Sequence, residues 1–236
     1  MKNINNFITE KLKISGNSKI IVYKYYPKSS EELKELIENI IKTEGGDVDL
    51  NNIDTSQIYD MHNLFLFKGN EEISNIKIDK WNVSRVKNMS NMFAGCGNFN
   101  CDLSNWDVSQ VKNMSGMFYK CLKFNSDISK WDVSKVEDME DMFISCKKFD
   151  QDLSKWNVSK VKSMIQMFRN CESFTGNGLS KWDISNCKYM SYMFYKCLSF
   201  TENLENWNIN ENIDIENMFT DCKRLYKKPK WYWREE

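Results

Sequence analysis

The chain has 236 residues, which is long enough for one large domain or one capped array of repeats. It carries 33 basic and 33 acidic residues, so its net charge gives no indication of binding to nucleic acid or to a membrane surface. Apolar residues make up 41% of the chain, which permits a sizeable core, but no apolar run approaches the ~18 residues of a membrane span. The N-terminal residues MKNINNFITEKLK lack the apolar segment of a secretion signal, so we expect a cytoplasmic protein if Met1 is the native start.

Residues 1–49 are predicted to form an N-terminal strand–helix capping region. The segment SKIIVYKYYP, residues 18–27, is typical of a strand, and residues 29–46 have the apolar spacing of an amphipathic helix. Ser29 and Glu32 fit a capping box, and Gly45 or Gly46 would end the helix. Such a cap is needed because the end of a repeat array exposes an apolar cross-section. The expected inward residues of the helix are Leu33, Leu36, Ile37, Ile40 and Ile41.

A short sequence repeat fills most of the remaining chain. It is marked by tryptophans at positions 81, 106, 131, 156, 182 and 207. Each is followed by Met after eleven residues, by Phe after twelve and by Cys after fifteen. A diverged copy with Ile53 in the tryptophan position precedes them, so residues 50–226 are predicted to hold about seven repeats.

Each repeat is expected to contain one short strand and one short helix. The pattern Leu103-x-x-Trp106-x-Val108 suits a short buried strand, and residues 111–121 carry apolar side chains three and four apart, as on one face of a helix. The sequence therefore predicts an α/β repeat solenoid of about seven turns, each a short parallel strand plus a short helix. All but one of the expected helices, the exception being the one at Tyr189, follow a residue suited to N-capping: Asp60, Asn88, Asn113, Asp138, Ser163 and Asp214.

The cysteine of each repeat could be a core residue, half of a disulfide, a zinc ligand or a nucleophile. Cys146 lies on the apolar stripe, as do its counterparts, and buried free cysteine behaves as a small apolar side chain. Disulfides need an oxidising compartment, and zinc needs a tetrahedral cluster of thiolates, which a linear ladder provides poorly. A nucleophile needs a base, and the chain has a single histidine, His62. We therefore interpret Cys146 as core.

Three further positions break the repeat pattern. Cys187 replaces a core valine and is expected inside. Cys101 replaces a polar residue and is expected at the surface, either as a neutral substitution or as a thiol open to modification. His62 occupies a position where other repeats have serine, so we expect a solvated surface histidine rather than a ligand.

The repeat W-[DN]-V-S-x-V-x-[ND]-M-x-x-M-F-x-x-C resembles the BspA-type leucine-rich repeat, which is found in bacterial surface proteins, protists, large viruses and phages. The resemblance covers most of the chain. It implies a right-handed leucine-rich-repeat solenoid with the strands on the concave side and the helices on the convex side. Members of that family are described mostly as adhesion or interaction proteins, so it also implies a binding role.

The surface left by the core offers a candidate partner-binding face. Small polar residues flank each tryptophan, and they either bond to neighbouring backbone, tying the repeats together, or form a binding face. Basic residues beside them are either simply solvated or contact an acidic partner or phosphates. In residues 227–236, the predicted C-terminal aromatic cap, Trp231 and Trp233 either cover the last repeat or contact a partner. The candidate residues are Lys80, Asn82, Arg85, Lys87, Asp107, Lys112, Lys130, Asp132, Lys135, Lys155, Lys160, Lys162, Asp183, Lys188, Trp231 and Trp233.

The sequence thus predicts a non-catalytic protein–protein interaction scaffold with an unidentified protein partner. In a phage or parasite, such a scaffold would bind and modulate a host protein. An extracellular adhesin or ligand-binding surface protein is the alternative. No catalytic, cofactor-binding or metal-binding residue is predicted, because the chain has one histidine, no glycine-rich phosphate loop and no metal-ligand spacing outside the cysteine ladder. We expect neither nucleic-acid binding nor membrane insertion, no cofactor, and a monomer by default.

Overall fold

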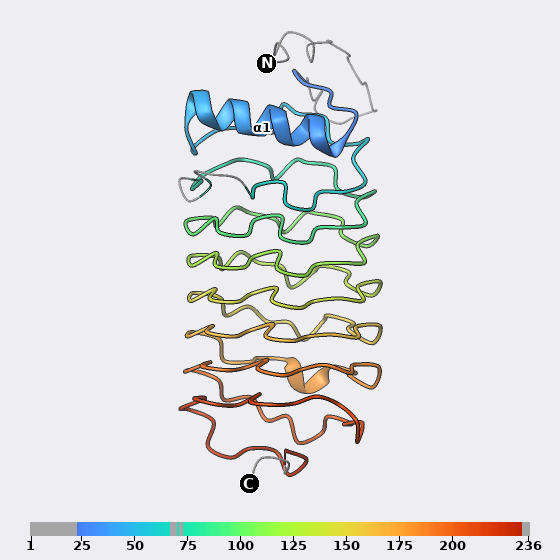
Figure 1. Ribbon diagram of the computed structural model, residues 1–236, viewed down its shortest axis with the longest axis vertical. Coiled ribbons are helices and arrows are strands. Elements are labelled where there is room, and N and C mark those ends of the chain that lie inside the picture. The colour runs from blue at the N-terminus through green and yellow to red at the C-terminus, as the bar shows by residue number, and fades with distance from the viewer. Residues whose placement is uncertain (1–22, 67–69, 71–72, 233–236) are drawn as a thin grey trace.

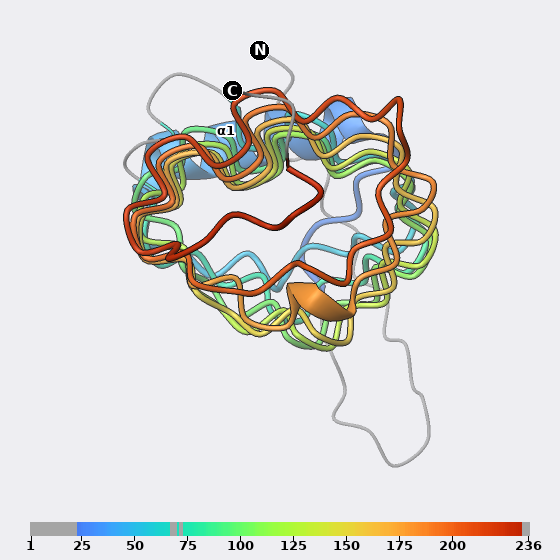
Figure 2. The same cartoon turned by 90° about the horizontal axis from the view of Figure 1, so that it is seen from below.

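The computed structural model of the chain describes residues 23–66, 70 and 73–232. Successive repeats form coils stacked along one long axis, and the helix α1 (Ser30–Glu44) lies across the N-terminal end (Figure 1). Seen along the stack, the coils superpose on one ring (Figure 2). Each repeat is therefore one circuit of the ring.

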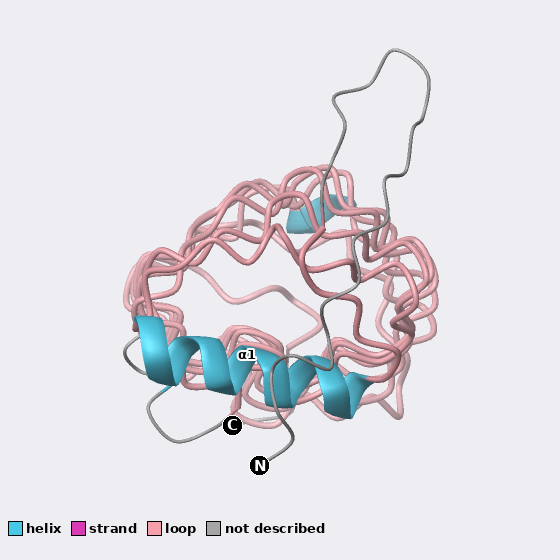
Figure 3. Ribbon diagram, turned by 90° about the horizontal axis from the view of Figure 1, so that it is seen from above, coloured by secondary structure: helices cyan, strands magenta, loops and turns pink. Residues whose placement is uncertain are grey.

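The predicted α/β solenoid of strands and helices is wrong. Within the described residues the regular elements are α1 and one turn of 3-10 helix, η3 (Leu179–Lys181), and there is no strand (Figure 3). The β-bridges between neighbouring coils are isolated and parallel, such as those of Asn113 with Asn88 and with Asp138.

Tight turns replace the expected strand and helix in each coil. The Trp106 N–H donates to the Leu103 carbonyl at 3.1 Å, and the Val111 N–H donates to the Val108 carbonyl at 2.9 Å. These bonds join residues three apart, as β-turns do. The first and last residues of these two turns are buried, so apolar residues lie three apart in the sequence although the backbone is not helical. An amphipathic helix has the same spacing, so the pattern alone does not distinguish the two.

Left-handed residues stop a helix from forming in the second half of each coil. Gly116 and Lys120 have φ of 60° and 57°, and their equivalents in the next repeat, Asp141 and Ser145, have 57° and 60°. A right-handed helix cannot pass through such residues. Glycine, asparagine and aspartate tolerate this conformation best. They occupy many of the equivalent positions: Asn63, Asn91, Gly95, Gly116, Asp141, Asn170, Asn217 and Asp221.

Backbone hydrogen bonds join each coil to the next in this segment. The N–H groups of Met114, Gly116, Phe118 and Lys120 donate to carbonyls of the following coil, at distances of 2.7–3.0 Å. The residues between them donate within the coil, so that nearly every peptide group has a partner. The same set of four bonds to the following coil recurs in four other repeats, where the first donors are the N–H groups of Met89, Met139, Met164 and Met190.

The predicted helix caps have a different role. The Asn113 side-chain Oδ1 accepts a hydrogen bond from the Ser115 N–H at 2.8 Å, which closes a local Asx turn rather than capping a helix. Asp138 does the same with Glu140 at 2.9 Å. These residues are also the ones that form the parallel bridges between coils.

Aromatic side chains fill the ring in continuous stacks. Phe93 and Phe118 lie 5.6 Å apart between ring centroids, and the phenylalanines of the following coils continue the stack. Trp131 is 3% exposed, and its indole Nε1 donates to the Leu103 carbonyl of the preceding coil at 3.0 Å. Every repeat tryptophan makes this bond. The tryptophans therefore stabilise both the core and the contact between coils.

The predicted helix over residues 29–46 is confirmed as α1. The Ser29 side chain accepts from the Glu32 N–H, Gly45 follows the last residue with φ of 87°, and all five expected inward residues are buried. The Ser30 hydroxyl donates to the Asp60 carbonyl, which places α1 against the first coil. Of the predicted strand at 18–27, residues 18–22 lie outside the described residues, and Tyr25 forms a single bridge with Ile53.

The longer repeat, between Trp156 and Trp182, accommodates its extra residue at two glycines. Gly176 and Gly178 have φ of 86° and 87°, and η3 follows them. A Cβ on Gly178 would lie 2.6 Å from the Ser154 backbone nitrogen, so the chain can pass here only without a side chain.

Candidate protein-binding face

The predicted contact residues form exposed rows on the outside of the stack. All fourteen from Lys80 to Lys188 are exposed. Residues in equivalent positions of neighbouring coils are spaced by about 4.8 Å, the distance between hydrogen-bonded chains. Trp233 lies outside the described residues.

The acidic residues that follow each tryptophan close local turns. The Asp132 carboxylate accepts a hydrogen bond from the Ser134 N–H at 3.0 Å, and Asp183 accepts from the Ser185 N–H at 3.1 Å. The hydrogen bonds from Ser134 lower the pKa of Asp132, and those from Ser185 lower the pKa of Asp183. One of the two expected roles of these residues, tying the repeats together, is wrong for Asp132 and Asp183, because these hydrogen bonds stay within one coil.

A different row of polar residues connects the coils. The Asn100 side chain accepts from the Asn125 N–H at 2.7 Å, and the Asn125 side chain accepts from the Asp150 N–H at 2.9 Å. Asp150 continues the row to the Thr175 N–H and hydroxyl, at 2.9 and 2.7 Å. This row was not predicted from the sequence. The pattern that could have indicated it is the polar residue directly after the second phenylalanine of each repeat.

The basic residues have different surroundings in different coils. The Arg85 guanidinium lies 4.3 Å from the centroid of the Tyr59 ring, a cation–π contact. The Lys135 ammonium donates to the Gln110 side chain at 2.8 Å. The Lys162 ammonium pairs with Glu137.

Five lysines, Lys112, Lys135, Lys160, Lys162 and Lys188, define what we call the lysine patch. Its centre is a shallow depression of about 450 Å³, lined by Glu137, Lys160, Lys162, Asn186 and Lys188. The hydrogen bond from Lys162 is the main cause that lowers the pKa of Glu137, and the charges of Lys112 and Lys160 lower it further. Glu137 thus lies among three lysines, and the patch keeps an excess of positive charge.

Trp231 is half-buried at the end of the stack. Its ring lies 6.1 Å from that of Trp207 at an angle of 11°, and its Nε1 donates to the Leu204 carbonyl at 2.8 Å. This arrangement matches its predicted role as a cover for the last repeat. Tyr232 packs edge-on against Phe219 with ring centroids 5.0 Å apart.

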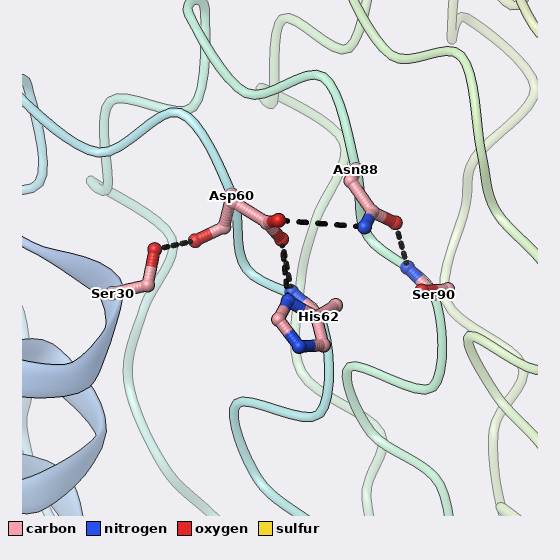
Figure 4. Close-up of polar contacts among 5 residues, drawn as sticks. All are labelled: Ser30, Asp60, His62, Asn88 and Ser90. Atoms are coloured by element: carbon pink, nitrogen blue, oxygen red, sulfur yellow. Dashed lines mark hydrogen bonds and ion pairs between the residues drawn. The ribbon is translucent and has the colours of Figure 1, made fainter.

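His62 is exposed, as predicted, and its Nδ1 lies 2.9 Å from the Asp60 carboxylate (Figure 4). Asn88, one coil further on, donates weakly to the other carboxylate oxygen of Asp60 at 3.5 Å. Ser30 contacts the Asp60 backbone carbonyl rather than the imidazole. The group therefore lacks the arrangement of a catalytic triad, in which the serine hydroxyl bonds to the histidine.

The repeat cysteines are core residues. Cys146 is fully buried, and its thiol donates to the Phe118 carbonyl of the preceding coil at 3.0 Å. Burial raises its pKa well above the usual value for a thiol. All eight cysteines are free, which excludes the disulfide ladder in this structure. Cys187 is buried as predicted, and burial raises its pKa to about 11.

The predicted exposure of Cys101 is wrong. The side chain is half-buried and packs against the core, and its thiol donates to the Ile76 carbonyl. Burial, with a smaller effect from Asp79, raises the pKa of Cys101 to about 12. The thiol is therefore protonated, and hence weakly nucleophilic, near neutral pH.

The described residues hold neither a cluster of metal-ligating side chains nor a membrane-spanning helix. They contain no group of three or more histidine, cysteine, aspartate or glutamate residues placed to hold a metal ion. None of their helices has the length and apolar character required to cross a bilayer.

These features define a stacked-repeat protein with a dense aromatic core and a mixed-charge, lysine-rich outer face. The chain belongs to the family described as "Mycoplasma protein of unknown function, DUF285", whose model matches it twice, over residues 31–143 and 123–232. Two overlapping matches are what an internally repeated chain produces. No curated protein matches the chain.

Proposed function

We propose that this protein is a non-catalytic protein-interaction scaffold, which contacts its partner through the exposed rows beside the tryptophans. The observation that carries the proposal is the lysine patch, in which Glu137 lies among three lysines on a backbone fixed by hydrogen bonds between coils. A rigid surface loses little conformational freedom on binding, and this favours recognition.

The non-catalytic part of the proposal is supported by the state of the thiols. Cys146 and four of its five counterparts are buried in the core, the fifth, Cys222, is half-buried, and the half-buried Cys101 has a raised pKa. Covalent catalysis needs an accessible and activated nucleophile. The likeness of the repeats to BspA-type repeats, whose members are mostly described as interaction proteins, supports the binding role. A phage or parasite source and a host partner are finer proposals that rest on that likeness.

A photo-crosslinking scan tests the scaffold function. A photoreactive amino acid is placed at Gln110 or Lys160 on the proposed face, and at Lys123 or Lys148, which are exposed but do not line the depression. We expect the two face positions to crosslink one and the same protein in a lysate of the source cell, and excess unlabelled chain to suppress the product. Crosslinking to no protein from either face position would contradict the proposal.

A further inference from the structure

Backbone hydrogen bonds join three consecutive coils at the centre of the lysine patch, at the equivalent positions of Glu137, Lys162 and Lys188, which form one row. The Lys162 N–H donates to the Glu137 carbonyl, and the Lys188 N–H donates to the Lys162 carbonyl, both at 2.9 Å. Consecutive side chains in this row therefore start about 4.8 Å apart. Lys160 precedes Lys162 by two residues and lines the same depression. Three lysines thus border a space that a small anionic group could enter.

The positive charge around the depression is incompletely neutralised. Glu137 is the one carboxylate among the lining residues, and it pairs with Lys162. Within the described part of the chain, neither Lys160 nor Lys188 has a carboxylate within ion-pair distance. Lysines elsewhere on the coils do have one, since Lys147 pairs with Glu172 at 3.0 Å. The depression is therefore complementary to carboxylates supplied from outside.

An aromatic residue that breaks the repeat pattern follows Lys188. Tyr189 occupies a row in which the neighbouring coils have Ser163 and Asp214, and 49% of its surface is exposed. Tyrosine is enriched among the residues that dominate protein–protein binding energies. Nothing in the packing of the coil requires an aromatic ring here, because the small residues of the same row form the same bridges.

We infer that the lysine patch binds an acidic segment of a partner protein, whose carboxylates contact Lys160, Lys162 and Lys188, with Tyr189 as an aromatic contact at the edge. The inference rests on the proposed scaffold function and adds the chemistry of the partner. A protein segment fits better than nucleic acid for two reasons. Glu137 would repel a continuous row of phosphates, and the depression has no arginine to bind a phosphate with two parallel hydrogen bonds.

The test uses a fluorescein-labelled peptide of alternating Glu and Ser, with binding followed by anisotropy at an ionic strength of about 0.15 M. We expect Lys160→Glu/Lys188→Glu to weaken binding about tenfold or more. The matched control, Lys123→Glu/Lys148→Glu, changes the net charge equally at exposed positions outside the depression and should weaken binding less than about threefold. Tyr189→Ser, which restores the residue found at position 163, should also weaken binding.

Equal losses in the two double variants would overturn the inference, because the peptide would then respond only to net charge. A DNA oligonucleotide of equal charge that binds more tightly than the peptide, and is lost with the same double variant, would overturn it in favour of nucleic acid. If the peptide fails to bind while Gln110 and Lys160 still crosslink a protein, the acidic partner is wrong and the scaffold function stands. Thermal unfolding of each variant checks that these surface changes leave the fold intact.

Discussion

The indole ring of Trp231 lies on that of Trp207, with centroids 6.1 Å apart and ring planes 11° from parallel. Trp231 donates to the Leu204 carbonyl at 2.8 Å, as Trp207 does to the Leu179 carbonyl, also at 2.8 Å. The tryptophan ladder therefore extends one step beyond the last repeat with the full sequence pattern. In Figure 2 the C-terminal segment, in dark red, crosses the open end of the ring formed by the last coil.

Trp231→Ala should lower the free energy of unfolding by about 2–4 kcal/mol, because it uncovers the apolar end of the stack. Trp231→Phe keeps a ring but loses the N–H donor, so it should cost about 1 kcal/mol. Urea unfolding measures both. An Ala variant as stable as wild type would mean that Trp231 does not cover the stack.

Gly116→Ala should destabilise the chain by about 1–3 kcal/mol, since φ is positive there and alanine disfavours that conformation. The new Cβ would also lie 2.1 Å from the Asn91 Oδ1, so this side chain must move. Gly97→Ala is the matched control, because its Cβ would meet only the Leu122 side chain at 3.8 Å and a carbonyl at 4.0 Å. We expect its stability to be unchanged or slightly higher. If the two variants unfold at the same urea concentration, the turn geometry assigned to residue 116 is wrong.

Stability should fall in alkaline solution because of the core thiols. Burial raises the pKa of Cys187 to about 11 and that of Cys222 to about 12, whereas an unfolded thiol has a pKa of about 8.5. Above about pH 8.5 the unfolded chain loses thiol protons that the folded chain keeps, so the unfolding free energy falls as the pH rises toward 11. Each such thiol contributes up to about 1.4 kcal/mol per pH unit. Urea unfolding between pH 7.5 and 10.5 measures this slope.

Lysine and tyrosine also titrate in alkali, so the thiol contribution needs its own control. In Cys121→Ala/Cys146→Ala two buried thiols are absent, and the fall in stability with pH should be shallower than in wild type. Identical slopes for the two proteins would show that buried thiols are not the cause.

The local turn at Asp132 predicts how the stability of the chain changes as the pH falls. Asp132→Ala should cost about 0.5–1 kcal/mol at pH 7, because the Ser134 N–H loses its acceptor. Asp132→Asn should be nearly neutral, since Asn157 accepts from the Ser159 N–H in the same way at 3.1 Å. The hydrogen bonds from Ser134 lower the pKa of Asp132, so the contribution of the carboxylate is present above about pH 4 and is lost as the pH falls. Thermal melts at pH 7 and at pH 3 should therefore show the Asn variant gaining on wild type in acid. Equal destabilisation by Ala and Asn at pH 7 would contradict the turn.

Periodicity predicted which side chains are buried but not the local backbone. Trp106, Met117 and Cys121 are inside as expected, and α1 has the predicted cap. The strand and the helix within each repeat were wrong because β-turns also place apolar residues three apart. Asn91 and Gly116, at equivalent positions of neighbouring repeats, were the available warning, since both residue types favour left-handed conformations that break a helix.

The exposure of the lysines could be predicted from the sequence, but their grouping around Glu137 could not. In the sequence Glu137 merely interrupts a row of basic residues, whereas in the structure it lies among three lysines at the depression. That arrangement depends on the register between coils, which local sequence does not specify. Cys101 was misplaced for the same reason, because the Ile76 carbonyl that its thiol contacts belongs to the preceding coil.

Hydrogen-bond scalar couplings measured by NMR on deuterated protein test most directly whether each repeat is a stacked coil of turns. The structure predicts a coupling between the Gly116 nitrogen and the Glu140 carbonyl carbon, and another between the Lys120 nitrogen and the Ile144 carbonyl carbon, for which the N···O distance is 2.7 Å in both cases. A helix across this segment would instead couple Gly116 to Lys112, four residues earlier. Couplings between coils would establish the stack. Couplings only within residues 111–121 would contradict it.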